Sequence, residues 1–66
     1  MDIDGAKLKR LRDERALTLR DLSELSGVDY TAISEIERGQ RKPHQSTVRK
    51  LATALGIQVR ELLRDE

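Results

Sequence analysis

Apolar residues recur at helical spacing along nearly the whole chain, and no stretch alternates as a strand would. In residues 5–15, Leu8 and Leu11 lie three apart on one face among strong helix formers. In residues 19–26, leucine recurs at positions 19, 22 and 25. Ile33 and Ile36 supply the buried stripe of a third segment, residues 30–38. The pattern therefore predicts an all-α fold.

Capping signals set the boundaries of these helices. Thr18 is a candidate N-cap with Asp21 three residues later, the spacing of a capping box. Gly27 follows the second helix where a left-handed C-cap residue belongs. Asp29 is a good N-cap for the third helix, which Gly39 ends. These residues predict two short helices joined by a tight turn.

The rest of the chain predicts two further helices. Pro43 prevents the third helix from continuing, and a fourth follows over residues 45–55, ended by Gly56. Its apolar face consists of Val48, Leu51, Ala52 and Leu55. Four more apolar residues predict a short fifth helix: Ile57, Val59, Leu62 and Leu63. We therefore expect a compact five-helix domain over residues 1–66.

Composition narrows the possible functions. The 66 residues include no cysteine and one histidine, which argues against disulfides and a thiolate metal site. No apolar run approaches the ~20 residues that span a bilayer, and the start lacks the apolar core of a signal peptide, so we expect a cytoplasmic protein. Nothing resembles a nucleophile–histidine–acid grouping, a phosphate-cradling glycine loop or a metal cluster. An enzyme, a cofactor or a small-molecule ligand is therefore not expected.

Charge changes sign sharply at the end of the third helix. From position 21 to 37 every charge is negative: Asp21, Glu24, Asp29, Glu35 and Glu37. From position 38 to 50 every charge is positive: Arg38, Arg41, Lys42, Arg49 and Lys50. Clusters of this kind can be ordinary solvated surface. A loop of Arg, Lys, Gly and Pro between two helices is less readily explained in that way.

Two short helices around a glycine form a helix-turn-helix candidate over residues 19–38. Ser23 is small where the helices should cross, and Gly27 can adopt positive φ at the turn. If Ile33 and Ile36 anchor the second helix, positions 30, 31, 34, 35 and 38 face outward. Tyr30, the one aromatic residue, lies off the buried stripe and is expected to be exposed.

Three stretches, taken in order, are similar to the lambda-type phage repressor and Cro family. They are "LKRLRDERALT", "GVDYTAISEIERGQRKP" and "LATALGIQVRELL", and together they cover nearly the whole chain. This resemblance implies a five-helix domain that binds double-stranded DNA, usually as a dimer. Its third helix would enter the major groove. Sequence-specific transcriptional regulation, more often repression, is the implied function.

The resemblance also implies roles for individual residues. Base-contacting positions are Asp29, Tyr30, Thr31, Ser34 and Glu35. Phosphate-contacting positions are Thr18, Leu19, Arg20, Arg38, Gln40, Arg41 and Lys42. Arg12 and Glu37 match a family pair that forms a partly buried salt bridge between the first and third helices.

Three positions depart from the family pattern. Leu19 stands where many members have a phosphate-binding glutamine, and His44 stands where a serine or threonine N-cap is common. Residues 29–37 hold no Arg, Lys, Gln or Asn, the usual bidentate readers of guanine and adenine. Base readout would then depend on Tyr30 and Thr31 against thymine methyls, on Glu35 at a cytosine amino group, and on DNA shape.

Two interpretations follow from these features. The leading one is a DNA-binding homodimer, with the apolar tail after Gly56 either completing the core or forming the dimer seam. The alternative is a protein-interaction module of the same fold, such as an antitoxin or a co-regulator, which the acidic helix face would favour.

Overall fold

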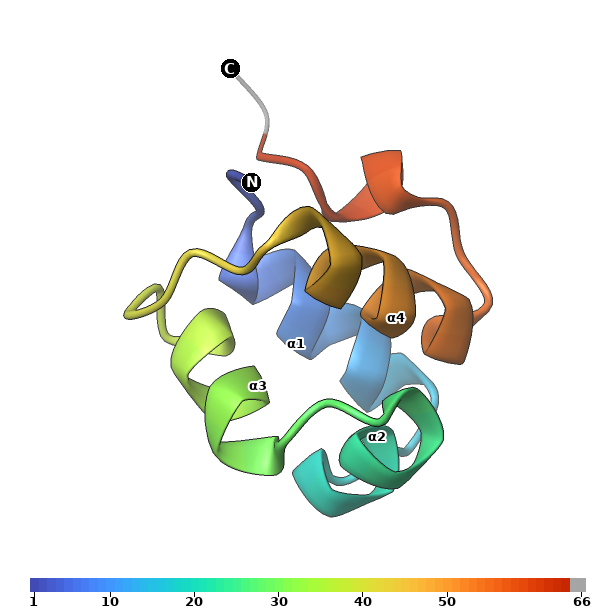
Figure 1. Cartoon of the computed structure of the whole chain (residues 1–66). Coiled ribbons are helices and arrows are strands. Elements are labelled where there is room, and N and C mark those ends of the chain that lie inside the picture. Colours follow the sequence, from blue (N-terminus) through green and yellow to red (C-terminus); the bar gives the residue numbers. More distant parts are fainter. Residues whose placement is uncertain (65–66) are drawn as a thin grey trace.

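The computed structural model describes residues 1–64, which fold into four α-helices and one 3-10 turn around a common core (Figure 1). The elements are α1 (Gly5–Glu14), α2 (Leu19–Ser26), α3 (Tyr30–Glu37), α4 (Gln45–Leu55) and η1 (Val59–Leu62). The predicted all-α class is confirmed. Helices α1 and α3 end one residue earlier than predicted because Arg15 and Arg38 occupy their C-cap positions.

The predicted fifth α-helix is wrong: this part of the chain forms only the four-residue 3-10 helix η1, which leaves out Ile57 and Leu63. Leu63, directly after η1, has extended backbone and pairs with Ile3 in an isolated antiparallel bridge. The Asp4 amide also donates to the Leu62 carbonyl, at 2.8 Å. The end of the chain therefore pairs with its beginning instead of continuing as a helix. Within residues 1–64 this bridge is the sole β-type pairing.

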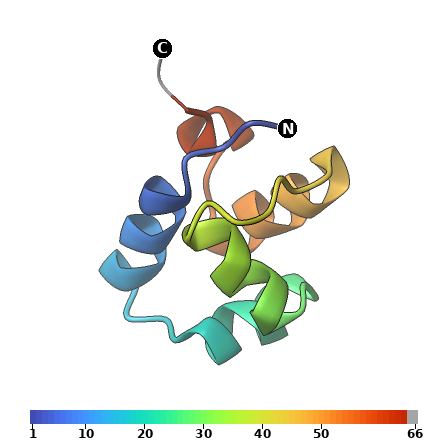
Figure 2. The same cartoon turned by 90° about the vertical axis from the view of Figure 1, so that its left-hand side faces the viewer.

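The core is entirely aliphatic. Helix α2 packs against α3 and α4, α1 packs against α3, and η1 closes the side formed by α1 and α4 (Figures 1 and 2). The buried apolar residues are Ile3, Leu8, Leu11, Leu22, Val28, Ile33, Ile36, Val48, Leu51, Ala52, Leu55 and Leu62. Both α3 residues predicted to anchor the helix, Ile33 and Ile36, are among them.

The start of α2 and the turn between α2 and α3 both form as their residues predict. Thr18 Oγ1 accepts a hydrogen bond from the Asp21 amide and Asp21 Oδ2 accepts one from the Thr18 amide, both at 2.9 Å. Gly27 adopts a φ of 76° and ends α2. Asp29 occupies the N-cap position of α3, but its carboxylate makes no capping hydrogen bond, and neither does the His44 side chain at α4. These two helices therefore begin without a side-chain cap.

Helix α1 begins in direct contact with the last turn of α3. A Cβ atom added to Gly5 would collide with the carbonyl oxygen of Ile36 and lie 2.6 Å from that of Glu37. Glycine at this position lets the two backbones approach, and so fixes the end of α3 against α1. None of the helices in the described part of the chain is both long and apolar enough to cross a membrane.

Candidate nucleic-acid interface

Helices α2 and α3 leave one side of α3 facing away from the core. In Figure 2, α3 lies in front, between the first turn of α2 and the loop that leads to α4. Tyr30 and Thr31 are exposed on this helix, and Ser34 and Glu35 are half-buried. Tyr30 is 51% exposed, as its position off the buried stripe predicts. We call the surface formed by these residues and Asp29 the α3 face.

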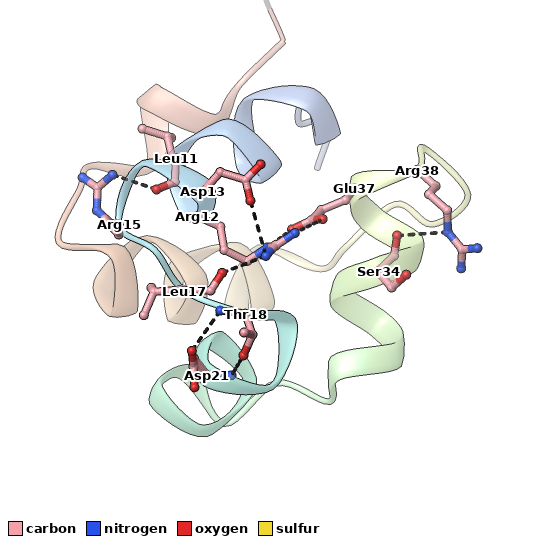
Figure 3. A network of polar contacts seen from close by, with 10 residues as sticks. All are labelled: Leu11, Arg12, Asp13, Arg15, Leu17, Thr18, Asp21, Ser34, Glu37 and Arg38. Carbon is pink, nitrogen blue, oxygen red and sulfur yellow. Dashed lines mark hydrogen bonds and ion pairs between the residues drawn. The ribbon is translucent and has the colours of Figure 1, made fainter.

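Arg12 and Glu37 join α1 to the end of α3 behind this face (Figure 3). Arg12 Nε donates to Glu37 Oε2 at 2.7 Å and Arg12 Nη2 donates to Glu37 Oε1 at 3.0 Å. The third nitrogen, Nη1, donates to the Leu17 carbonyl at 2.8 Å. The hydrogen bond to Glu37 raises the pKa of Arg12 above its ordinary value, and burial opposes that rise. Glu37 is therefore an internal, neutralised charge.

A Schellman motif anchors the basic loop, residues 38–42, to the end of α3. Gly39, with a φ of 75°, donates its amide to the Ile36 carbonyl at 3.1 Å. The next amide, of Gln40, donates to the Glu35 carbonyl at 2.8 Å. These bonds satisfy carbonyls that the helix end would leave open. They therefore fix the turn by which the basic loop leaves the end of α3.

The loop also reaches back with a side chain. Arg41 Nε donates to Glu35 Oε1 at 2.9 Å, and Arg41 Nη2 lies 2.6 Å from the same oxygen. The sequence resemblance implies a base contact for Glu35 and a phosphate contact for Arg41, but not this contact between them. Gly39 signals a Schellman turn after α3, but whether Arg41 then reaches Glu35 depends on the direction in which that turn sends the chain.

The other predicted contact residues lie on either side of α3. At the start of α2, Thr18 and Arg20 are exposed and Leu19 is half-buried. The Thr18 hydroxyl already accepts a hydrogen bond from the Asp21 amide. In the loop, Arg38, Gln40, Arg41 and Lys42 are all exposed. Arg38 folds against its own helix, donating from Nε to the Ser34 carbonyl at 3.3 Å (Figure 3).

The acidic and histidine side chains of the described residues do not gather into a metal site. In residues 1–64, no group of three or more His, Cys, Asp or Glu side chains could hold a metal ion. In the same span, every buried side-chain nitrogen and oxygen has a hydrogen-bond partner. The features that remain are a protruding helix face and exposed cations around it, an arrangement suited to a groove lined with phosphates.

Comparisons with known proteins agree with this geometry. A helix-turn-helix family model matches residues 8–62. The transcriptional repressor RghR of Bacillus subtilis is 47% identical over 58 residues, which are 86% of this chain and 43% of RghR. The restriction-modification controller protein C.AhdI from Aeromonas hydrophila superposes with a TM-score of 0.87 at 42% identity, over 89% of each chain. The N-terminal DNA binding domain of SinR from Bacillus subtilis gives 0.86 at 30% identity, over 94% of this chain and 91% of that one.

The chain is therefore a helix-turn-helix protein. It belongs to the Cro/C1-type family of DNA-binding transcriptional regulators, and members of this family are not enzymes. The chain spans 21% and 43% of the length of the curated relatives that it matches at 45% and 47% identity.

Proposed function

We propose that this chain binds a two-fold operator in double-stranded DNA as a homodimer, with α3 in the major groove, and represses transcription. The observation that carries the proposal is the α3 face itself, which protrudes from the core between the first turn of α2 and the basic loop (Figure 2). An α-helix fits the major groove, and flanking cations can reach the phosphates on either side.

Contacts follow from this placement. The proposed base-contacting residues are Asp29, Tyr30, Thr31 and Ser34, with Glu35 on the same face. The proposed phosphate-contacting residues are Thr18, Leu19, Arg20, Arg38, Gln40 and Lys42, with Arg41 exposed beside them. Phosphate contacts would fix the register of the protein on the duplex, and the α3 face would select the sequence.

The acidity of α3 is compatible with DNA binding, because two of its charges are neutralised within the protein. Glu37 pairs with Arg12 behind the helix, and Glu35 pairs with Arg41 at its outer end. An acidic helix face was also the reason to consider a protein-interaction module. The two ion pairs weaken the case for a protein-interaction module, because they neutralise Glu35 and Glu37. Of the acidic residues on the α3 face, Asp29 then has no described partner within residues 1–64.

Two relatives support the proposed role in repression. RghR is a transcriptional repressor, and another relative, 37% identical over 62 residues, is the immunity repressor of Bacillus phage phi105. A dimer whose α3 helices lie about one DNA turn (~34 Å) apart would match a symmetric operator.

The tail after Gly56 offers three apolar residues for a dimer seam. Leu62 is fully buried in its own core, whereas Ile57, Val59 and Leu63 are half-buried. We also propose a cytoplasmic location, because a transcriptional regulator must reach the DNA.

The salt dependence of DNA binding tests this proposal. Binding to duplex DNA should weaken steeply as salt rises, because each neutralised phosphate releases counterions. Lys42→Ala, in the loop, should reduce the slope of log K against log salt by about 1. Arg60→Ala is the matched control: it removes one exposed charge from η1, at the far end of the molecule from α2 (Figure 2), and should leave the slope unchanged. A flat salt response of the unaltered chain would contradict DNA binding.

A further inference from the structure

The Arg41–Glu35 pair has an unusual geometry. Two nitrogens of the guanidinium, Nε and Nη2, both approach the single carboxylate oxygen Oε1, at 2.9 and 2.6 Å. A guanidinium carries five N–H donors in one plane. The side edge of Arg41 is therefore occupied, whereas Nη1 makes no described contact within residues 1–64, so the end edge formed by Nη1 and Nη2 is available. The Arg41 side chain as a whole is 52% exposed, so solvent reaches it.

The pair also places the guanidinium on the α3 face. Glu35 lies one helical turn after Thr31, so their side chains share one side of the helix. Arg41 is drawn over the end of that side by its contact with the Glu35 carboxylate. Its own backbone is fixed nearby, because the preceding amide, of Gln40, donates to the Glu35 carbonyl at 2.8 Å. One residue of α3 therefore holds Arg41 through both its side chain and the adjoining turn.

We propose that Arg41 reads a guanine in the major groove, and that Glu35 is the positioning residue that orients its guanidinium. This proposal rests on the proposed DNA-binding function and names a specificity-determining residue for it. Guanine presents two acceptors in the major groove, O6 and N7, and two N–H groups from one arginine edge match them. The open Nη1–Nη2 edge is such an edge.

Two further arguments favour this role. Residues 29–37 hold no Arg, Lys, Gln or Asn, so Arg41 supplies the bidentate donor that α3 itself lacks. The side chain is also ordered before binding, which lowers the conformational entropy lost when it contacts a base. The Glu35 charge is then used to fix its neighbour rather than to read a cytosine directly.

A phosphate contact by the same edge is the competing role, and the carboxylate disfavours it. A phosphate at the Nη1–Nη2 edge would put two anions across one guanidinium, with Glu35 on one side and DNA on the other. Guanine O6 and N7 are neutral acceptors and bring no such repulsion. Exposed Lys42, with no described carboxylate partner among residues 1–64, is better suited to phosphate.

Selection from a randomised duplex pool, run in parallel for the unaltered chain and two variants, tests the proposal. Arg41→Lys keeps the charge but loses the planar fork. We expect guanine at one position of each half-site to be preferred by the unaltered chain. Arg41→Lys should reduce that preference by about 5- to 150-fold, with unrelated DNA bound as before. Glu35→Gln should reduce it at the same position, and circular dichroism should show both variants folded.

Other outcomes separate the possibilities. If Arg41→Lys keeps every base preference, Arg41 contacts phosphate and the proposal is overturned, whereas the DNA-binding function stands. If Glu35→Gln alters a different position from Arg41→Lys, Glu35 reads a base itself and its positioning role is wrong. If the unaltered chain enriches no sequence, the proposed function and this inference both fail. Lys42→Ala, the reference variant, should weaken binding to all sequences equally.

Discussion

Arg12 on α1 and Glu37 at the end of α3 form a two-point ion pair that is almost wholly removed from solvent. Their side chains are 9% and 6% exposed, and Nε and Oε2 are 2.7 Å apart. Leu17 supplies a carbonyl to the remaining guanidinium nitrogen, so the charge is fully partnered. This pair fixes the last turn of α3, from which the basic loop departs.

Removing one member of the pair should therefore be costly. We expect Glu37→Ala to lower the free energy of unfolding by about 3–5 kcal/mol, because Arg12 would keep a buried charge without its partner. Urea denaturation followed by circular dichroism measures this. Glu14→Ala is the control: Glu14 pairs with Arg10 at 3.8 Å, but both side chains are more than half exposed, so the change should stay below about 0.5 kcal/mol. Equal losses of unfolding free energy in the two variants would show that the buried pair contributes no more to stability than the exposed one.

A second prediction concerns the contact between α1 and α3. Alanine favours helix over glycine, yet Gly5→Ala should destabilise the protein by about 1–3 kcal/mol, since its Cβ would collide with α3 backbone that must shift. The thermal midpoint should fall accordingly. Lys9→Ala, at an exposed position of the same helix, should change stability by no more than about 0.5 kcal/mol. A stabilised Gly5→Ala variant would mean that the two backbones separate easily.

The fold was largely predictable because its local signals agree with its packing. Thr18, Asp21 and Gly27 set the bounds of α2 at the predicted residues, and Ile33 and Ile36 are buried as their spacing indicates. The sequence did not reveal that a short 3-10 helix and an extended residue would replace the predicted fifth helix. Apolar spacing does not reveal that the backbone after Leu62 pairs with the chain start.

The candidate site was predictable as a surface but not as a network. Outward positions on α3 follow from helical periodicity, and the pairing of Arg12 with Glu37 was implied by family resemblance. The contact of Glu35 with Arg41 depends on the angle at which the turn at Gly39 returns the chain, and side-chain chemistry alone does not give that angle. The tight approach at Gly5 likewise depends on how two helices pack.

A third prediction concerns Ala16, a left-handed residue that the sequence does not signal. Its φ is 55°, and its amide and that of Leu17 donate to the carbonyls of Asp13 and Arg12, as in a Schellman motif usually closed by glycine. An alanine in this region is strained by about 1–2 kcal/mol. Ala16→Gly should therefore raise the free energy of unfolding by up to about 1 kcal/mol after the extra chain entropy is subtracted.

The matched control for this change is the same substitution inside a helix. Ala6→Gly, in α1, should lower the free energy of unfolding by about 0.5–1 kcal/mol, because glycine is a poor helix former. Thermal denaturation of the two variants gives the comparison. If both substitutions destabilise the protein alike, the turn at position 16 is not strained.

A fourth prediction concerns pH and the capping box of α2. Hydrogen bonds from Thr18 lower the pKa of Asp21 below its ordinary value, the backbone amide contributing most. A lowered pKa means that the charged carboxylate favours the folded state. Its contribution is complete above the unfolded pKa of about 3.9 and is lost as pH falls through the lower folded value.

Asp21→Asn keeps the shape of the cap and removes its charge. The thermal midpoint of the unaltered chain should exceed that of Asp21→Asn near neutral pH, and the difference should shrink as the solution is acidified below about pH 4. A difference that stays constant across this range would show that the charge of Asp21 plays no part in the cap.

Recognition of a specific symmetric DNA sequence by α3 underlies the proposed function. The most direct test is to select binding sites for the unaltered chain from a randomised duplex pool and then measure how many chains bind the selected duplex. We expect an inverted repeat whose half-sites lie about 10–10.5 base pairs apart, bound by two chains. A pool that shows no enriched sequence after selection would contradict it.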